Sequence, residues 1–420
     1  MRTLIWVSIS ILAAGMFRAR SAQALDGHVL DAINGQPVRG AIVTATVAGG
    51  TQIAVAAEDG SFQFASAPQK VAARAIGYGR AAAVTQDDLS HLVLRLSPLR
   101  PKGLYLSVYG VGDAGLRDAA VKLVDITELN ALVIDVKGDR GLIPYPSGVA
   151  GAISCGARSQ TTVRDMSAVI AYLKSHGIYL IGRIVVFKDH PLANCHPEWA
   201  VKVTKGQLFR DREQQAWIDP SRREAWSYSL ALAAEAAALG FDEIQFDYVR
   251  FPDAQGLQFS VPGTAANRSA AITGFLAAAR ARLAPYNVFI GADIFGYVAW
   301  NESDTGIGQD LLQLVETVDY LSPLLYPSGY KYGIPGYADP IRHPYEIVYL
   351  TLRHALERAH ISPLRLRPWL QAFRDYAFDR RLFDADEIRA QIRGAEQAGS
   401  DGWMLWNPRN IYTADGLSPR

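Results

Sequence analysis

The sequence predicts an α/β protein in which a (β/α)8 TIM barrel follows a small antiparallel β-sandwich. Eight short apolar runs, each followed by a helix-like stretch, fill residues 103–412, whereas residues 25–97 hold short strand-like runs between tight-turn signals. Strands that alternate with helices pair in parallel, because each right-handed crossover returns the chain to the same edge. Eight such units suit a closed barrel. An open doubly wound sheet is the alternative, although no glycine-rich phosphate loop follows the first strand.

Residues 1–24 have the pattern of a signal peptide. Arg2 provides a positive start, residues 4–16 form an apolar run that is short for a membrane span, and Ala22-Gln23-Ala24 has the small-x-small form that signal peptidase accepts. We expect cleavage, export to the periplasm or the extracellular space, and no stable membrane span afterwards, because no second apolar run follows. An uncleaved membrane anchor is the alternative.

Residues 25–97 are typical of a small antiparallel sandwich. Turn signals such as Asn34-Gly35 and Asp59-Gly60 separate segments of β-type composition. Residues 98–102 contain Pro98 and Pro101 and are expected to form a linker, because proline cannot continue a hydrogen-bonded ladder. The expected strands of the sandwich cover residues 28–30, 41–47, 52–56, 61–64, 70–76 and 91–96.

The barrel is expected over residues 103–420. Its clearest helix covers residues 221–239, with Ser221 and Glu224 as a capping box and Gly240 as the stop. Further helices are expected over residues 267–283, 344–359 and 384–397. The eight expected strands cover residues 104–109, 131–136, 179–186, 243–248, 288–294, 320–325, 366–372 and 402–406.

The fourth expected barrel strand carries the strongest functional signal. Side chains alternate along a strand, so Glu243, Gln245 and Asp247 share one face, and the apolar residues between them share the other. The polar set therefore faces the barrel interior. Such an interior costs free energy unless it is hydrogen-bonded or functional. Because Asp247 lies at the strand exit, where barrel enzymes place their chemistry, we expect a functional role for Asp247 and structural roles for the two deeper residues.

Other strand exits also bring acids, bases and aromatics to the same opening. Aromatic rings suit sugars, whose C–H faces stack on them while hydroxyls meet carboxylates and amides, so a polysaccharide or oligosaccharide partner is expected. Trp300, Tyr330, Tyr332 and Tyr337 are further members of this aromatic platform. The expected substrate-binding residues are Asp135, Lys137, Arg183, Arg250, Tyr297, Tyr326, Gln371, Trp406 and Asn407.

Two carboxylates on neighbouring strands provide what glycoside hydrolysis needs. Asp247 and Asp293 form the best pair, and the roughly 4.8 Å spacing of strands favours the ~5–5.5 Å separation of retaining enzymes. Asp247 is then the nucleophile, kept ionised by Arg183 or Arg250, and Asp293 is the acid/base with a raised pKa. The alternative candidates for the acid are Asp135, Asp253 and Glu302.

The cysteines and the net charge bear on three further features: a disulfide, a metal or cofactor site, and a nucleic-acid partner. Cys155 and Cys195 follow neighbouring expected strands, so one disulfide is plausible in an exported protein, and two free thiols are the alternative. Neither Cys195-His196 nor Asp189-His190 has the spacing of a zinc motif, so no metal site and no cofactor are expected. The formal net charge is +1 and no basic stretch occurs, so no nucleic-acid partner is expected.

Two segments resemble known families. Residues 27–31 (GHVLD), 35–38 (GQPV), 59–62 (DGSF) and 75–78 (AIGY) resemble the carboxypeptidase regulatory-like domain, a transthyretin-like sandwich that is mostly accessory. The barrel segment resembles a bacterial family classed as glycoside hydrolases and formerly as a domain of unknown function. The resemblance implies a TIM barrel distantly related to α-amylase-like enzymes, with Asp247 as nucleophile; Asp293 stands where those relatives usually have Glu. It is carried by residues 133–137 (VIDVK), 242–252 (DEIQFDYVRFP), 291–296 (GADIFG) and 403–407 (WMLWN).

The leading hypothesis is therefore an exported glycoside hydrolase that acts on a bacterial envelope or extracellular polysaccharide, with the sandwich as a spacer or docking module. A second hypothesis is a non-catalytic, glycan-binding envelope protein built on a barrel. A third is a metal-dependent hydrolase or deacetylase, which would need clustered His and carboxylate ligands at strand exits. No histidine falls on an expected strand exit.

Overall fold

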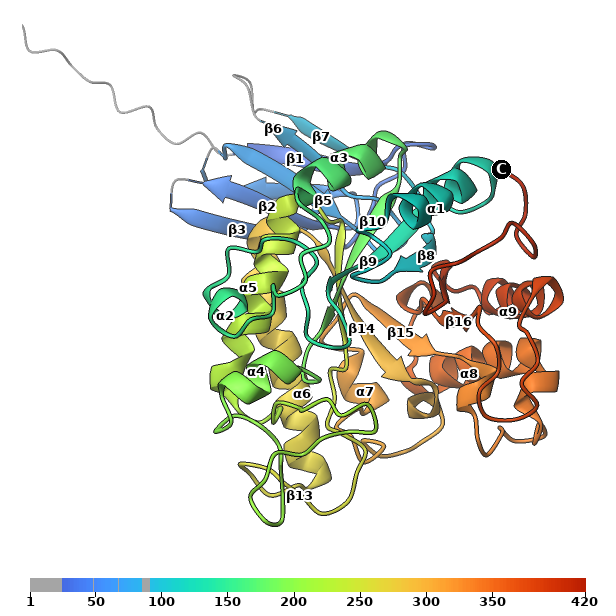
Figure 1. Cartoon of the computed structure of the whole chain (residues 1–420). Helices are drawn as coiled ribbons and strands as arrows, with labels where there is room; N and C mark the ends of the chain where they lie inside the picture. Colours follow the sequence, from blue (N-terminus) through green and yellow to red (C-terminus); the bar gives the residue numbers. More distant parts are fainter. Residues whose placement is uncertain (1–24, 48, 67, 85–90) are drawn as a thin grey trace, which may run out of the picture.

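The computed structural model of the chain describes residues 25–47, 49–66, 68–84 and 91–420. The signal peptide expected over residues 1–24 lies outside these residues. Figure 1 shows two β-sheets of the N-terminal segment at one end of a barrel. The strands of the N-terminal segment are β1 (Leu25–Asp31), β2 (Ile42–Val47), β3 (Gly50–Val55), β4 (Ser61–Phe64), β5 (Lys70–Arg74), β6 (Ala81–Val84) and β7 (Leu92–Leu96).

The N-terminal segment forms the predicted small sandwich. One sheet has the order β4-β1-β7 and the other the order β3-β2-β5-β6. All strand pairs are antiparallel except β1 with β7, which run parallel. Strand β6 is absent from the prediction, because Ala81-Ala82-Ala83 lacks the β-branched and aromatic residues that indicate a strand. Alternate residues of both sheets, including Val29, Val43 and Phe62, bury a common apolar core.

The predicted closed barrel is confirmed. Eight parallel strands close in the order β10-β12-β14-β15-β16-β17-β8-β9, so every strand neighbours those before and after it in the series. This order excludes an open doubly wound sheet. The strands are β8 (Lys102–Leu106), β9 (Ala131–Lys137), β10 (Tyr179–Val185), β12 (Glu243–Asp247), β14 (Phe289–Phe295), β15 (Tyr320–Leu324), β16 (Trp369–Gln371) and β17 (Trp403–Trp406).

Helices surround the barrel and connect its strands (Figure 1). They are α1 (Ala114–Ile126), α2 (Ala150–Ser154), α3 (Met166–Ser175), α4 (His190–Cys195), α5 (Arg223–Leu239), α6 (Ala265–Leu283), α7 (Leu311–Leu314), α8 (Pro344–Ala359) and α9 (Ala385–Gln397). A two-stranded sheet joins β11 (Lys202–Val203) to β13 (Leu257–Gln258). Within the described residues, no helix combines the length and hydropathy that a membrane crossing requires.

The ends of α5 test the predicted capping signals. Gly240 ends the helix as predicted, in the left-handed region at φ 114°, where a residue without Cβ is favoured. The predicted capping box is wrong, because the N-cap is Arg222 and it makes no side-chain cap. A capping box occurs instead at α9, where Asp384 and Glu387 cap reciprocally.

The polar residues deep in the barrel form a hydrogen-bonded layer, as expected for Glu243 and Gln245. Arg367 bonds Glu243 at 2.5 Å and Asp401 at 2.9 Å, and all three side chains are completely buried. Gln245 donates to Ser322 Oγ at 3.0 Å. Because each charge has a partner, this layer stabilises a unique barrel interior without exposing a reactive group.

The sandwich closes the end of the barrel where the strands begin. Arg74 of β5 pairs with Asp319, which directly precedes β15, at 3.3 Å. Asn287, two residues before β14, donates to Thr44 Oγ1 of β2 at 2.8 Å. Ile76 and Leu99 pack against the apolar cluster inside the barrel. Leu99 belongs to the predicted linker, so this linker is a packed connection. The opposite end, where the strands exit, stays open for a site.

We predict that the sandwich and the barrel unfold as one unit. Within residues 25–420 every tryptophan lies in the barrel segment, so tryptophan fluorescence reports barrel unfolding alone. Arg74→Met removes the cation from a largely buried pair, and we expect the fluorescence-detected free energy of unfolding to fall by about 1–3 kcal/mol. Arg39→Met is the matched control, because the Arg39–Glu58 pair on the same sandwich is exposed and should contribute little. An unchanged barrel transition in Arg74→Met would show that the two units unfold independently.

Candidate functional site

A large pocket opens at the strand exits of the barrel. Its volume is about 1310 Å³. Arg183 of β10, Asp247 of β12 and Trp406 of β17 line it, together with residues of the loops that follow the strands. This is the end of a TIM barrel at which active sites are built.

Arg183 is the centre of the pocket floor. Its guanidinium bonds Asp135 at 2.7 Å, Asp139 at 2.6 Å and Asp247 at 2.6 Å, and the arginine is only 1% exposed. Trp406 covers it on one side, with the guanidinium carbon 4.8 Å from the ring centroid. One cation therefore forms ion pairs with three carboxylates. Burial raises the pKa of Asp135 to about 6 against the opposing charge of Arg183, so Asp135 takes up a proton as the pH falls through this value.

Asp247 is fixed at the end of β12 but remains in contact with the pocket. Arg183 Nε and Nη2 both donate to Asp247 Oδ2, at 2.9 and 2.6 Å. Asp247 Oδ1 accepts from the backbone N–H of Tyr248, whose φ of 48° is uncommon for a residue with Cβ. Strained backbone of this kind persists where the surroundings hold it and clusters at functional sites. The two hydrogen bonds from the Arg183 guanidinium hold the Asp247 carboxyl group in one orientation.

Asp293 lies beside Asp247 on the neighbouring strand. Phe246 pairs with Ala292, so the next residues, Asp247 and Asp293, stand at the same level of the barrel. Asp293 Oδ1 accepts from Trp369 Nε1 at 2.9 Å, whereas Oδ2 has no partner among the described residues. Burial, and then the charge of Asp247, raise the pKa of Asp293 well above its ordinary value. Asp293 is 2% exposed and lies beneath the pocket surface rather than in its lining.

Aromatic residues form much of the pocket wall. Tyr297, Tyr326 and Trp406 line it as predicted, and Trp406 stacks on Tyr105 at 3.8 Å between ring centroids. Burial and the charges of Asp293 and Asp247 raise the pKa of Tyr326, so its hydroxyl stays protonated beside the two acids. Trp300 and Tyr332 line a separate cavity of about 510 Å³, which shares Tyr297 with the main pocket. Tyr330 lines the main pocket although it is 1% exposed.

Lys137 and Gln371 are corrections to the expected substrate contacts. Lys137 is completely buried in a pair with Asp189 at 2.5 Å, against Ser229 of α5. The strand register shifts after Asp135, because Arg183 pairs with Asp135 and Ile184 with Lys137. This bulge turns Lys137 toward the helices. Gln371 is also completely buried, and its amide donates to Ser328 Oγ at 2.7 Å, so it holds a loop instead of lining the pocket.

The remaining predicted residues divide between the pocket and its support. Arg250 and Asn407 line the pocket, although the Asn407 amide already donates to Ala372 O at 2.7 Å. Asp135 is 1% exposed and supports Arg183 from below. The alternative acids Asp253 and Glu302 are exposed residues outside the pocket lining.

Several residues that line the pocket were not predicted from the sequence. Asp139 lines the pocket and shares Arg183 Nη2 with Asp247. Glu213 lines it from the long segment between β10 and β12 and pairs with Lys188 at 2.8 Å. Asp139 follows the exit of β9, so its position gave a signal, whereas nothing in the sequence places the loop of Glu213 over the opening.

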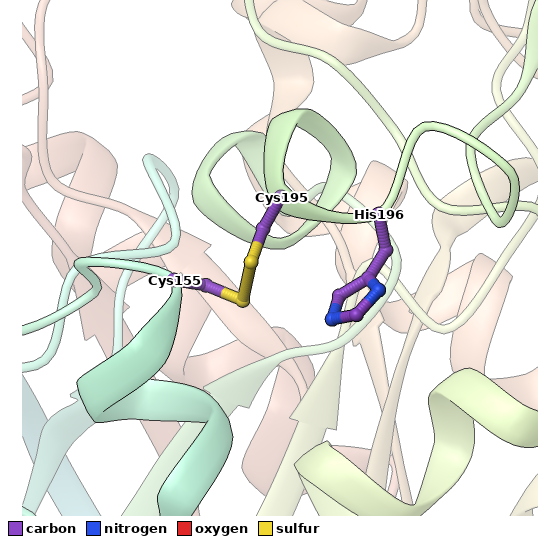
Figure 2. Close-up of side chains that lie close together, drawn as sticks. All are labelled: Cys155, Cys195 and His196. Atoms are coloured by element: carbon purple, nitrogen blue, oxygen red, sulfur yellow. A yellow bond between two sulfur atoms is a disulfide. The ribbon is translucent and has the colours of Figure 1, made fainter.

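The two cysteines form the disulfide that the sequence made plausible (Figure 2). Cys155 follows α2 and Cys195 ends α4, so the bridge links the loops after β9 and β10, with a Cα–Cα distance of 5.4 Å. His196 lies beside them, and the three ligand-type atoms are within 4.8 Å of one another. This is the one such grouping among the described residues. The bonded sulfurs are not thiolates, which are the metal-binding form of cysteine.

We predict that Arg183 controls stability through charge. Arg183→Met leaves three acids without their cation, and we expect a loss of about 3–5 kcal/mol in the free energy of unfolding near pH 8. The loss should shrink toward pH 5, because Asp135, with its pKa near 6, then binds a proton and needs no cation. Denaturation at both pH values measures this difference. Arg358→Met is the control, because Arg358 donates hydrogen bonds to the carbonyls of Val298 and Ala299. The decrease in the free energy of unfolding that this substitution causes should not vary with pH. A pH-independent loss in Arg183→Met would contradict the prediction.

Of three similar solved structures, one has a TM-score above 0.5 and supports the fold. The glycoside hydrolase domain of PgaB (BpsB) from Bordetella bronchiseptica is 14% identical, with 75% of this chain and 95% of that chain covered and a TM-score of 0.52. A hypothetical protein from Ruminiclostridium thermocellum is 37% identical over 45% of this chain and 96% of that chain, with a TM-score of 0.41. The spore cortex-lytic enzyme SleL from Bacillus megaterium is 12% identical over 80% of this chain and 77% of that chain, with a TM-score of 0.46.

Family membership rests on the barrel. None of the curated proteins matches the chain. Residues 103–412, from β8 to the segment after β17, match the family described as "Putative glycosyl hydrolase domain". This match covers well over half of the chain and includes Asp247, Asp293 and most of the residues that line the pocket. The chain belongs to this glycosyl hydrolase domain family.

Proposed function

We propose that the chain is an exported glycoside hydrolase that cleaves a polysaccharide of the bacterial envelope or of the extracellular space. The observation that carries the proposal is the setting of Asp247. Its carboxyl group accepts two hydrogen bonds from the guanidinium of Arg183, it lines a pocket with an aromatic wall, and a second carboxyl group with a raised pKa stands beside it. An ionised and a protonated carboxyl at one site are the two groups that glycosidic cleavage uses.

In the proposed mechanism Asp247 attacks the anomeric carbon and Asp293 supplies the proton to the departing oxygen. Water then cleaves the glycosyl ester of Asp247, with Asp293 now accepting the proton. The equal level of the two residues on adjacent strands supports the short separation that retaining enzymes use. Arg183 stabilises the carboxylate of Asp247 before attack and after release.

Substrate class and location rest on the wall of the pocket and on the disulfide. Tyr297, Tyr326 and Trp406 supply ring faces for sugars, and a pocket of about 1310 Å³ is larger than a single sugar needs. The Cys155–Cys195 bridge supports an oxidising compartment such as the periplasm or the extracellular space. We further propose that the sandwich is a carboxypeptidase regulatory-like domain that acts here as a fixed support of the barrel, since it packs against the strand starts.

We predict that Asp247→Asn abolishes turnover and preserves binding. The amide keeps the shape of the carboxyl but cannot attack, so kcat on the cleaved member of a bacterial polysaccharide panel should fall by at least about 10³-fold. Asp253→Asn is the control, because Asp253 is an exposed acid outside the pocket lining and its loss should leave kcat unchanged. Glycan binding without turnover in the parent protein would instead identify a glycan-binding protein.

We predict that the protonation of Asp293 sets the alkaline limit of activity. Asp293 must carry its proton to donate it, and its raised pKa keeps the proton to a higher pH than an ordinary carboxyl does. The kcat/KM should therefore fall as pH rises through this pKa, and Asp293→Asn should remove that limb. In the Asp293→Asn variant, kcat/KM should fall least for aryl glycosides with good leaving groups, because their departure needs no protonation by an acid. If Asp139→Asn removes the alkaline limb and spares these aryl glycosides while Asp293→Asn does neither, Asp139 is the acid/base.

A further inference from the structure

Arg250 is a pocket arginine that makes no ion pair with any acid among the described residues. It follows the end of β12 by three residues and lines the same pocket as Asp247. Its guanidinium carbon lies 4.7 Å from the ring centroid of Phe295, 4.9 Å from that of Trp217 and 5.1 Å from that of Tyr248. Three rings thus hold the group in place at the pocket surface, where cation–π contacts orient a guanidinium without neutralising its charge.

The hydrogen-bond capacity of Arg250 is mostly unused. A guanidinium has five N–H donors. Within the described residues, Arg250 makes one hydrogen bond, from Nη1 to the carbonyl of Phe251 at 2.9 Å, and no ion pair. Burial lowers the pKa of its guanidinium, and Tyr248, Asp247, Asp253 and Asp211 oppose this only through space. Packing on aromatic rings explains the position of the side chain. It does not explain a partly buried cation with free donors, because such a charge costs free energy unless an anion compensates it.

Three acids of the pocket lining are already paired. Asp247 and Asp139 bind Arg183, and Glu213 binds Lys188. The lining also includes exposed residues of both signs, namely Arg374, Arg409, Asp384, Asp386 and Asp415. On the floor, Arg183 is saturated by acids, so among the described residues Arg250 is the floor cation that remains available to a ligand.

We propose that Arg250 forms an anion subsite that selects glycans whose sugars carry a carboxylate, that is, uronic-acid sugars. The planar fork of the guanidinium matches a carboxylate through two parallel hydrogen bonds. Its place three residues after Asp247 puts the charged substituent on a sugar close to the cleaved bond. This assignment of substrate class rests on the proposed function for its link to cleavage, but the binding that it describes is measurable without turnover.

The experiment measures binding to matched ligands that differ only in charge. The full chain with Asp247→Asn is titrated with a panel of oligouronates and with the same oligosaccharides after reduction of their carboxyl groups to neutral alcohols. We expect at least one oligouronate to bind about tenfold more tightly than its reduced form, and added salt to weaken that difference. A sulfated neutral oligosaccharide separates carboxylate recognition from attraction to any anion, and it should bind less tightly than the oligouronate.

Arg250→Gln in the same background should abolish the preference for the oligouronate and leave affinity for the reduced form within about twofold. Arg250→Lys should keep part of the preference, since it keeps the charge and loses the fork. Arg353→Gln is the control, because Arg353 of α8 is an exposed arginine outside the pocket lining, and this variant should keep the preference for the oligouronate. Unchanged thermal midpoints establish that the variants fold. Equal affinity for charged and reduced ligands in the parent, or an equal loss for both in Arg250→Gln, overturns the proposal. The two proposals can fail separately. If uronate binding depends on Arg250 but the parent protein, which keeps Asp247, cleaves no oligouronate, the anion subsite is upheld and only the hydrolase proposal is refuted.

Discussion

The site depends on the balance of charge around Arg183. A buried guanidinium and three carboxylates share the floor of the pocket, so at least one acid must be protonated or open to solvent for the group to be tolerable. The three acids meet this requirement in different ways, according to how deeply each one is buried. Asp135 is buried and titrates near pH 6, Asp139 is partly exposed, and Asp247 receives two of the bonds from Arg183. Asp247 is therefore paired with the cation, whereas Asp293 makes no ion pair among the described residues and its pKa lies well above the ordinary value.

Most of the fold could be predicted because it depends on local periodicity. Each barrel strand is a short apolar run followed by a helical pattern, and the period-two alternation correctly assigned Glu243, Gln245 and Asp247 to the interior. Details that depend on partners distant in sequence were less predictable. Ser221 has the spacing of a capping box, yet α5 begins after Arg222 and the Ser221 hydroxyl makes no hydrogen bond.

The site was predictable where a residue follows a regular strand and less so elsewhere. Asp247 was selected by strand parity, Asp293 as an acid at the exit of the neighbouring strand, and Arg183 as a base on another expected strand. All three meet at the pocket floor or directly beneath it. Lys137 has the same parity as Asp135, but the bulge between them reverses its direction, and no sequence signal marks that bulge. Asp139 and Glu213 depend on loop paths, which the strand pattern does not determine.

The charge of the whole chain gives little information about the ligand of one pocket. A formal net charge of +1 gives no sign of a charged partner, because acids and bases cancel over the entire surface. Within the pocket, acids neutralise some of the neighbouring cations but not all of them. Arg183 is saturated by acids and Lys188 by Glu213, whereas Arg250 is surrounded by rings that cannot neutralise it. The charge of the ligand is therefore inferred from Arg250, the floor cation that makes no ion pair within the described part of the chain. A sugar carboxylate close to Asp247 completes that pairing only when substrate is bound.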